Sequence, residues 1–484
     1  MKPLKLYEEN LKMKKFFYLF YTFILFLLFA FVNVSFAANS LNRASRNDAN
    51  VIDKAQIFKI MKLVADWQLH NPVRFDITFR TEHEKMIEQI GVLWDGTVMS
   101  RSASALKNES SFSIEPWFNF AKINSEIISF CELPDAVQST LNTTLKVKPS
   151  QILKIRMENN SSKGWEQGAL YTGLYAFSEI SEDSIYTKAL KIICEANQWK
   201  LGPRIYHADD HCVGQLYLDM YKLFKKANMI SDVQMRFDWI IKHPAEQSVW
   251  IKEGQERWTW CDALFMSPPV WAKLSSITGS MEYLDFMNRE WWATADHLYD
   301  KKENLFFRDD RYFEGREPNG KKIFWSRGNG WVMAGIARIL EEMPQNYLAR
   351  PRYEKILKEM ADKIALLQTD NGLWHPSLLD TEHYPFTETS CSGFFCYAFA
   401  WGVNNGLLDR AKFLPVIQKA WDGLIGSIGK DGKLGWVQLP GHSPDEVKSE
   451  NTASYGVGAF LLAGSEVYKL CSTIEDPEQN KIKK

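Results

Sequence analysis

From about residue 165 onward, the sequence alternates between two kinds of helical segment. One kind is punctuated by glycine, rich in aromatic residues and apolar on nearly all sides, and it occurs at 165–177, 209–221, 260–274, 326–340, 392–406 and 455–470. The other kind is amphipathic, with apolar residues on a single stripe, as in 183–199, 281–298, 352–367 and 411–428. A helix that is apolar all round must be buried, whereas a helix with one apolar stripe can cover it from outside.

This alternation predicts an all-α fold, an (α/α)6 barrel with six inner and six outer helices. Residues 47–69 have the amphipathic pattern expected of the first outer helix. Repeated helical hairpins also build open solenoids, but solenoid repeats are more uniform than these segments, whose loops are long and individually different. We therefore expect one catalytic barrel domain over residues 38–470.

Two segments fall outside the alternation. Residues 71–160 contain alternating apolar and polar pieces between polar stretches. We interpret them as an insertion between the first outer and the first inner helix, with some β structure. Residues 471–484 form a polar tail.

The N-terminus has the pattern of an export signal. Lysines precede a nearly uninterrupted apolar run over 16–34, and small residues follow at Ser35 and Ala37. This pattern predicts a signal peptide over 1–37 and a periplasmic or secreted protein, with no membrane association after cleavage. An uncleaved membrane anchor is the alternative, because the run is almost long enough to span a bilayer.

Composition narrows the class of protein. A hydrophobic content of 45% excludes a disordered chain, and 58 Lys+Arg against 59 Asp+Glu gives no positive surplus for binding nucleic acid. Aromatic residues make up 14% of the chain, which suits a large core and also suits stacking against sugar rings. The seven cysteines lack C-x-x-C spacing, so a zinc or redox site is unsupported, although a single disulfide stays open.

In a barrel of this kind, the loops before the inner helices line a central pocket, so polar residues at the helix starts are the candidates for chemistry. The second inner helix begins with the sequence YHADDHC, which contains Asp209, Asp210 and His211. This cluster has metal-ligand residue types, but its spacing matches no standard zinc motif, and an aspartate at a helix start is often a cap. We expect an active-site carboxylate here and no metal.

Asp262 stands out at the start of the third inner helix. It lies in an apolar, aromatic sequence together with Trp260, and burying a charged carboxylate there is costly. An apolar environment raises a carboxyl pKa, as a general acid near neutral pH requires. The alternative is a structural aspartate that caps the next helical turn.

Aromatic and basic residues precede the fourth and fifth inner helices. Trp325 and Arg327 stand before a Gly-Asn-Gly sequence, and Trp374 and His375 precede the fifth helix. The planar guanidinium of Arg327 suits a substrate carboxylate, with a structural salt bridge as the alternative. We include all four as candidate substrate-binding residues.

The strings WCDALFM, WSRGNGW, DNGLWHPSLLD and ETSCSGFF, with YGVGAFLLA at the end, resemble glycoside hydrolase family 105. That family comprises unsaturated rhamnogalacturonyl hydrolases, which are close in mechanism to the unsaturated glucuronyl hydrolases of family 88. The resemblance covers residues 47–70 and 160–470. It implies an (α/α)6 barrel that removes a terminal 4,5-unsaturated uronic acid from oligosaccharides released by polysaccharide lyases, without a cofactor.

The resemblance also implies roles for single residues. Asp262 matches the catalytic aspartate, and the ADDH segment matches a second carboxylate, for which we favour Asp210 over Asp209. Trp325 and Arg327 match a pair that contacts the unsaturated sugar. Arg308 stands where some members have histidine, a departure that bears on the leaving sugar and on recognition of the carboxylate.

The implied mechanism is hydration of a double bond. Asp262 would protonate C4 of the enol ether, water would add at C5, and the resulting hemiketal would open and release the rest of the oligosaccharide. Other readings are an inverting glycosidase, a sugar epimerase or a non-catalytic carbohydrate-binding toroid. The last would keep the aromatic residues but would not need Asp262.

Overall fold

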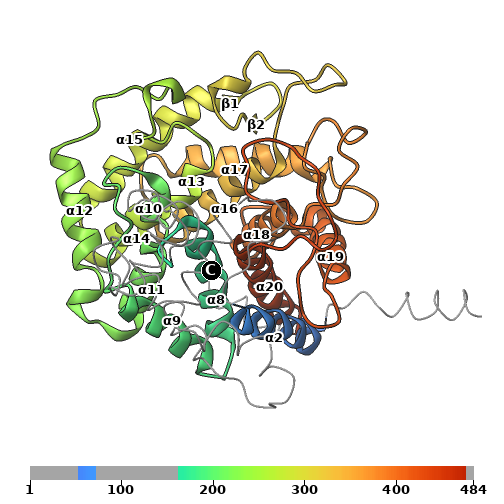
Figure 1. The fold of residues 1–484 in the computed structure, drawn as a ribbon, viewed down its shortest axis with the longest axis horizontal. Coiled ribbons are helices and arrows are strands. Elements are labelled where there is room, and N and C mark those ends of the chain that lie inside the picture. Colours follow the sequence, from blue (N-terminus) through green and yellow to red (C-terminus); the bar gives the residue numbers. More distant parts are fainter. Residues whose placement is uncertain (1–52, 72–161, 476–484) are drawn as a thin grey trace, which may run out of the picture. The chain divides into compact units, whose positions relative to one another are not determined.

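The computed structural model describes residues 53–71 and 162–475, and each of its six inner helices overlaps one of the six apolar segments (Figure 1). Each inner helix is buried over most of its length because apolar and small residues occupy nearly all its sides. The inner helices are α8 (Trp165–Ile180), α11 (Gly214–Phe224), α14 (Pro268–Thr278), α16 (Ser326–Glu342), α18 (Thr389–Asn404) and α20 (Ser454–Glu475).

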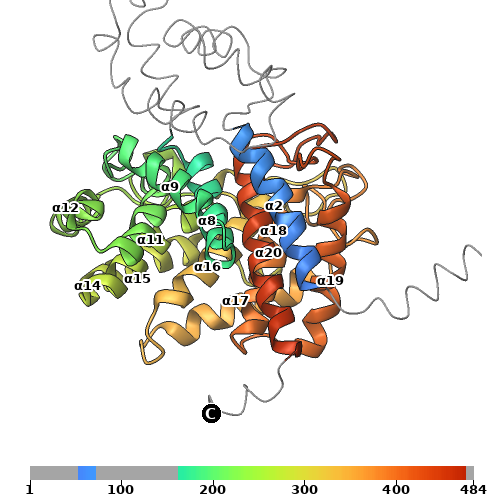
Figure 2. The same cartoon turned by 90° about the horizontal axis from the view of Figure 1, so that it is seen from below.

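The outer helices carry their buried residues on one side only. In α17, for example, the residues Tyr353, Leu357 and Ile364 are buried, while charged residues lie between them. Figure 2 shows α2 lying alongside α20, in agreement with their contacts. The outer helices are α2 (Lys54–His70), α9 (Ile185–Ala196), α12 (Ser231–Lys242), α15 (Met281–Leu298), α17 (Arg350–Ala365) and α19 (Arg410–Gly426).

The inner helices form a closed ring. Each contacts the next in chain order, and the last, α20, packs extensively against the first, α8. An open solenoid would leave its first and last repeats apart. The (α/α)6 barrel predicted from the alternating segments is therefore confirmed.

Glycines allow the inner helices to approach one another closely. A Cβ atom on Gly173 of α8 would lie 2.3 Å from the carbonyl oxygen of Gly458 in α20, and one on Gly458 would lie 2.3 Å from the carbonyl oxygen of Ala169. Between α16 and the third repeat, a Cβ atom on Gly335 would lie 2.3 Å from the carbonyl oxygen of Leu264. Any larger side chain at these positions would force the helices apart.

Two inner helices begin with a separate short turn. Helix α10 (Ala208–His211) precedes α11, and α13 (Ala263–Met266) precedes α14. Pro268 and Pro269 lack the backbone N–H that would continue the α13 hydrogen bonds, so α14 starts anew at Pro268. These turns place Asp209, Asp210 and Asp262 at helix beginnings.

The connection between α15 and α16 contains the only strands in the part of the chain that is described. Strands β1 (Tyr299–Asp300) and β2 (Leu305–Phe306) pair antiparallel, and the chain after β2 leads directly to Arg308. Short 3-10 turns occur at η2 (Ala227–Met229), η3 (Ile251–Glu253) and η4 (Asp310–Tyr312).

Several sequence predictions concern residues that the structure does not describe. The proposed signal peptide, nearly all of the insertion over 71–160 and most of the polar tail lie outside the described ranges. Within those ranges, no helix is long and apolar enough to cross a membrane. The six cysteines there are buried and form no disulfide with one another.

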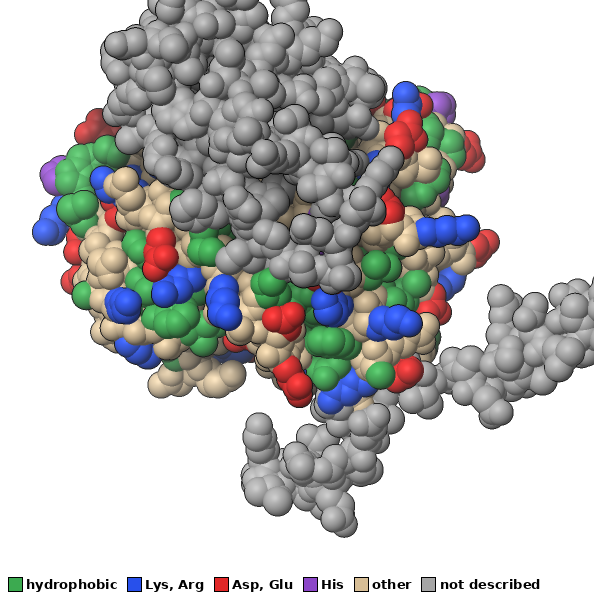
Figure 3. All heavy atoms as spheres, turned by 60° about the horizontal axis from the view of Figure 1, so that its bottom comes forward, with side chains coloured by type: hydrophobic (Ala, Val, Ile, Leu, Met, Phe, Trp, Pro, Cys, Tyr) green, Lys and Arg blue, Asp and Glu red, His purple; other side chains and the backbone are tan. Residues whose placement is uncertain are grey.

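The visible surface carries both signs of charge. On the face shown in Figure 3, lysine and arginine side chains are interspersed with aspartate and glutamate over the described residues. This mixture agrees with the formal net charge of −1. Attraction of an anionic substrate must then depend on local groups rather than on a field of one sign.

Candidate active site

Asp262 is the residue immediately before α13 and is only 8% exposed. Its side chain makes no capping hydrogen bond to the helix, so the alternative of a purely structural cap is not supported. Its Oδ2 atom lies 3.4 Å from the Nε atom of Arg308 and accepts a long contact of 3.6 Å from the thiol of Cys261. This carboxyl group is buried, next to a cation, and available for chemistry.

The surroundings of Asp262 favour its protonated form. Burial raises the pKa of this carboxyl above its usual range, although the positive charges of Arg308 and Arg327 partly oppose the shift. A carboxyl with a raised pKa can donate a proton nearer neutral pH than an exposed aspartate can. These properties are the ones that the apolar sequence around Asp262 predicted.

Arg308 is brought to Asp262 by the chain after β2. The backbone carbonyl of Arg308 accepts a 2.8 Å hydrogen bond from the N–H of Cys261, which ties the two loops together. The Nη1 atom of Arg308 also donates to Asp309 at 2.6 Å, and Asp309 is fully buried and paired with Arg311 as well. Asp309 was not anticipated from the sequence, although its place between two arginines was a signal for an ion pair.

Asp209 is the second carboxyl group that couples to Asp262. Burial raises its pKa to about 7, with contributions from the negative charges of Asp210 and Asp262 and opposition from Arg204 and Arg308. Its side chain keeps 21% of its surface exposed. The part-buried Asp209 and the buried Asp262 are thus two interacting carboxyl groups at the starts of the second and third repeats.

Asp210, which the sequence analysis favoured as the second catalytic carboxylate, has a different environment. Its two oxygens accept hydrogen bonds from the backbone N–H of Arg204 at 2.6 Å and from the guanidinium of the same residue, also at 2.6 Å. A Cβ atom on Gly202 would lie 2.5 Å from the Asp210 carboxyl carbon. The carboxylate is occupied in fixing the loop before α10, so the geometry favours Asp209.

His207 and Trp260 border this pair. The Nδ1 atom of His207 accepts a hydrogen bond from the N–H of Asp209 at 3.3 Å, and its ring lies 5.0 Å from the ring of Trp260. The other ring nitrogen contacts the Gln255 side chain at 3.3 Å. Burial lowers the pKa of His207 to about 4, so the ring is neutral near pH 7.

Arg327 and Trp325 are buried together at the start of α16. The guanidinium stacks 4.4 Å from the Trp325 ring and 4.9 Å from the Tyr455 ring. Its terminal nitrogens donate to the backbone carbonyls of Gln438, at 2.5 Å, and Leu439, at 3.0 Å. The Arg327 guanidinium, which the sequence analysis expected to bind a substrate carboxylate, therefore donates to main-chain oxygens instead. Only 1% of the residue is exposed.

Gln438 was not anticipated from the sequence, yet it joins three inner-helix starts. Its side-chain oxygen accepts from Trp325 at 2.8 Å, its backbone oxygen accepts from Tyr455 at 2.5 Å, and its N–H donates to Glu388 at 3.0 Å. Its position in a long loop gave no periodic signal that could have identified it.

Three other candidates are held in structural contacts. Both ring nitrogens of His211 are engaged, with Ser267 at 2.8 Å and the carbonyl of Ile205 at 2.7 Å. Trp374 is buried and donates to the carbonyl of Ile364 in α17, and the Nδ1 atom of His375 lies 2.7 Å from the carbonyl of Phe386. None of these contacts involves Asp262.

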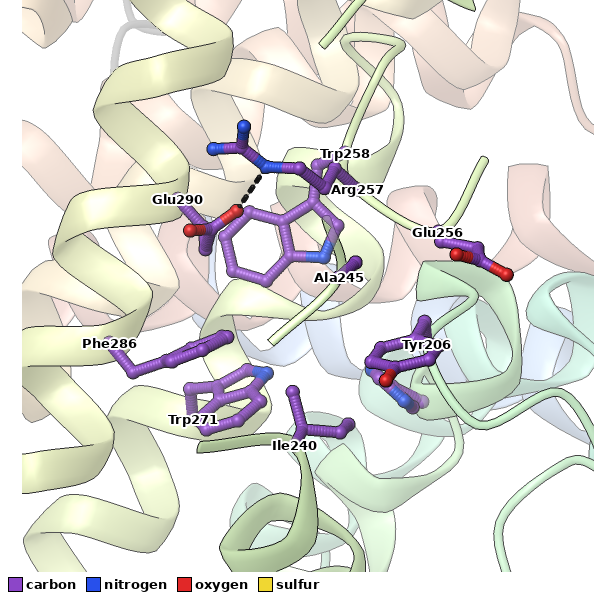
Figure 4. A pocket seen from close by; sticks show the side chains of 10 residues that line it. Tyr206, Ile240, Ala245, Glu256, Arg257, Trp258, Trp271, Phe286 and Glu290 are labelled. Atoms are coloured by element: carbon purple, nitrogen blue, oxygen red, sulfur yellow. Dashed lines mark hydrogen bonds and ion pairs between the residues drawn. The ribbon is translucent and has the colours of Figure 1, made fainter. Parts of the chain in front are cut away.

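His211 instead helps to line a separate pocket, other lining residues of which are labelled in Figure 4. Aromatic rings including Tyr206, Trp258 and Phe286 surround this pocket, and Arg257 donates to Glu290 across one side at 2.7 Å. Neither Asp209 nor Asp262 contributes to its lining. No group of three His, Cys, Asp or Glu residues within 53–71 and 162–475 is arranged to hold a metal ion.

Comparisons with known proteins identify related enzymes of sugar chemistry. The chain is 42% identical over 320 residues to an unsaturated 3S-rhamnoglycuronyl hydrolase of Formosa agariphila, covering 63% of this chain and 84% of that protein. A glycosyl hydrolase family 88 structure from Bacteroides vulgatus is 30% identical, with a TM-score of 0.60, and the match covers 63% of this chain and 92% of that one. A solved structure described as a polysaccharide lyase is 31% identical, also with a TM-score of 0.60, over 64% of this chain and 92% of that one.

The sequence model of Glycosyl Hydrolase Family 88 matches residues 136–471, which is more than half of the chain. The match begins inside the segment that we interpreted as an insertion and runs to the last turn of the barrel. The group of unsaturated uronyl hydrolases named from the sequence motifs is thus confirmed, and the chain belongs to Glycosyl Hydrolase Family 88.

Proposed function

We propose that Asp262 and Asp209 carry the reaction of this glycoside hydrolase, which removes a terminal 4,5-unsaturated uronic acid from an oligosaccharide. The observation that carries the proposal is the Asp262 carboxyl group, buried at a helix start, free of capping bonds and with a raised pKa. Such a group can both give and recover a proton within one turnover.

The proposed reaction begins at the double bond. The Asp262 carboxyl transfers its proton to C4, and the positive charge that develops at C5 is shared with the ring oxygen. Water then adds at C5 and loses its proton to Asp262 or Asp209, which restores a protonated carboxyl. The C5 hemiketal opens to a ketone, and the hemiacetal formed at C1 releases the rest of the oligosaccharide as an alcohol.

Arg308 is the better candidate for holding the carboxylate of the uronic acid. The Arg308 side chain, whose guanidinium lies beside Asp262, is 14% exposed. Arg327, in contrast, is buried and donates to two backbone carbonyls. We propose that Arg327 instead shapes the wall behind the sugar. A charge-assisted, two-bond contact from an arginine suits a planar carboxylate.

We further propose rhamnose as the sugar next to the unsaturated residue. This proposal draws on the name of the relative from Formosa agariphila, an unsaturated 3S-rhamnoglycuronyl hydrolase, and on its 42% identity. The test compares unsaturated disaccharides that differ only in this second sugar. A higher kcat/KM on the rhamnose-linked compound supports the proposal, and equal values on all compounds contradict it.

Ultraviolet absorbance separates the proposed activity from its rivals. The conjugated double bond of the substrate absorbs, so the hydrolase should remove the signal from a lyase-digested polysaccharide. A lyase would raise the signal on undigested polysaccharide, an inverting glycosidase would release sugar from saturated chains, and a non-catalytic binder would leave the signal unchanged. Dialysis against EDTA should not alter the rate.

The export of the protein is also a proposal, supported by the lysines and the apolar run that end near Ala37. N-terminal sequencing of protein recovered from its native host should begin after that residue. A protein that retains the apolar run and sediments with membranes would indicate an anchor instead.

A further inference from the structure

The side chain of Asn329 holds the strand that leads to Arg308. Asn329 lies in the first turns of α16 and is completely buried. Its side-chain oxygen accepts from the N–H of Phe306 at 2.8 Å, and its side-chain nitrogen donates to the carbonyl of the same residue at 3.0 Å. One amide group thus satisfies both backbone atoms of Phe306, as a neighbouring strand would.

The strand held in this way is only two residues from the guanidinium beside Asp262. From Phe306 the chain continues to Arg308, whose backbone carbonyl accepts from Cys261, the residue before Asp262. The strand pair β1–β2 is short, so its own ladder offers little to fix this segment. The two hydrogen bonds from Asn329, in inner helix α16, therefore hold β2 in place where the small sheet alone would not.

We propose that Asn329 is a positioning residue that fixes Arg308 against Asp262 and thereby sets the pH range in which the acid works. The inference rests on the proposed function, because it takes Asp262 as the proton donor. It assigns to the Asn of the Gly-Asn-Gly sequence a role that acts through the backbone of β2 and makes no contact with Asp262 itself.

The charges around Asp262 give the sign of the effect. Arg308 faces it from the chain after β2 and is itself paired with Asp309. Arg327 acts on it from α16, Asp209 interacts with it from α10, and the Cys261 thiol adjoins it. The nearest cation is Arg308, which stabilises the ionised form and opposes the effect of burial on the pKa of Asp262. If Arg308 is allowed to move away, the acid keeps its proton to higher pH.

The test is a double-mutant cycle on the pH profile of kcat/KM. Arg308→Met should move the alkaline limb of the profile upward by about one to three pH units, the range expected when an opposite charge near a carboxyl is removed. Asn329→Ala should move the same limb in the same direction by a smaller amount. The double variant should show the same shift as Arg308→Met alone. Once the guanidinium is absent, Asn329→Ala can no longer change its position relative to Asp262.

Controls separate this role from a general loss of stability. Met333→Ala removes a fully buried side chain one turn further along α16, so it should lower Tm and leave the limb in place. Asn329→Ser is compared with Asn329→Ala because a serine hydroxyl can replace one of the two hydrogen bonds to Phe306. All profiles are recorded below the Tm of the least stable variant.

Each outcome bears on one claim. A limb that stays in place in folded Asn329→Ala and Asn329→Ser, while Arg308→Met moves it, overturns the positioning role. Shifts of Asn329→Ala and Arg308→Met that simply add also overturn it. If Asp262→Asn retains wild-type turnover, the proposed function fails first.

Discussion

Neighbouring carboxyl groups in this site differ because their partners differ. Asp210 accepts hydrogen bonds from the backbone and the guanidinium of Arg204, whereas no such pairing holds Asp209. Burial raises the pKa of Asp209 and of Asp262, which suits groups that exchange protons with a substrate near neutral pH. Which of these carboxyl groups can exchange a proton with the substrate therefore depends on the hydrogen bonds that its oxygen atoms already accept.

Asp209→Asn should stabilise the protein at neutral and alkaline pH while reducing activity. Burial raises the pKa of Asp209 from 3.8 in the unfolded chain to about 7, so the native state binds its proton more tightly than the unfolded state does. This contribution to stability is complete below pH 3.8 and is lost as the pH rises to about 7. Because asparagine does not ionise, the variant should avoid the loss, which is of the order of 2–4 kcal/mol.

The measurement is Tm against pH for the wild-type protein and for Asp209→Asn. The two curves should converge in acid and separate steadily as the pH approaches 7. Asp210→Asn is the comparison, because it breaks the contacts to Arg204 and should lower Tm at neutral pH instead. A constant difference between the wild type and Asp209→Asn at every pH would contradict the account.

Residue identities were predictable where the sequence context was extreme. An aspartate within WCDALFM has to be buried, and this located Asp262. The choice between Asp209 and Asp210 was not predictable, because successive helical residues point about 100° apart and the loop before them decides which one meets Arg204. The hydrogen bonds from Arg327 to the carbonyls of Gln438 and Leu439 were likewise not predictable, because that loop lies more than 100 residues away in the sequence.

The helices depend on close contacts as much as on amphipathic patterns. Gly173→Ala would place a methyl group 2.3 Å from the carbonyl oxygen of Gly458. We expect the free energy of unfolding to fall by roughly 1–3 kcal/mol or more as α8 and α20 separate. Thermal denaturation should show a clear drop in Tm.

Gly426→Ala is the matched control for that substitution. Gly426 is also helical, at the end of α19, but a Cβ atom there would meet nothing within 4 Å. The exchange should leave stability unchanged or raise it slightly, because alanine is the better helix former. If both substitutions lower Tm equally, Gly173 is not required for the close approach of α8 and α20.

Helix positions followed from the sequence, but their internal breaks did not. The apolar segments predicted at 209–221 and 260–274 each contain a short turn and a separate main helix. Ser267 and Pro268 explain the second break, since proline cannot donate the next hydrogen bond. Hydrophobic periodicity continues across such a break and therefore gives no warning of it.

The ring of helices encloses charge at the end away from the helix starts. A pocket there is lined by residues from all six inner helices, including Asp219, Lys273 and Glu342. Lys273 forms ion pairs with Asp219 and, at 3.8 Å, with Glu342, and the three side chains are no more than 7% exposed. The barrel thus joins its helices through buried ion pairs as well as apolar contacts.

Lys273→Met should destabilise the whole barrel without changing the chemistry at Asp262. Removing one member of a buried ion pair costs up to about 3–5 kcal/mol. Glu342 keeps its contact with Lys222, and Asp219 keeps only Arg338 at 3.8 Å. Lys355→Met is the control, because its 3.7 Å pair with Glu359 is exposed and should contribute little. Chemical denaturation and kcat below the Tm are the readouts, and an unchanged midpoint for Lys273→Met would contradict the role of these ion pairs.

For the whole molecule, the barrel and its family were predictable because they rest on a repeated pattern and on several motifs in a fixed order. The buried ion pairs were not predictable, since they join separate helices, as Lys273 of α14 joins Asp219 of α11 and Glu342 of α16. A charged residue on an inner helix has to find a partner, but the sequence does not say which one.

Turnover in D₂O, followed by NMR of the released sugar, tests the central claim most directly. If Asp262 protonates C4 of the double bond, the uronic acid product should carry one deuterium at C4, added from a single face. Asp262→Asn should remain folded and lose roughly 10²–10⁴-fold or more in rate, since an amide cannot donate and recover the proton. Release of the neighbouring sugar with the double bond intact, or full activity in Asp262→Asn, would contradict the account.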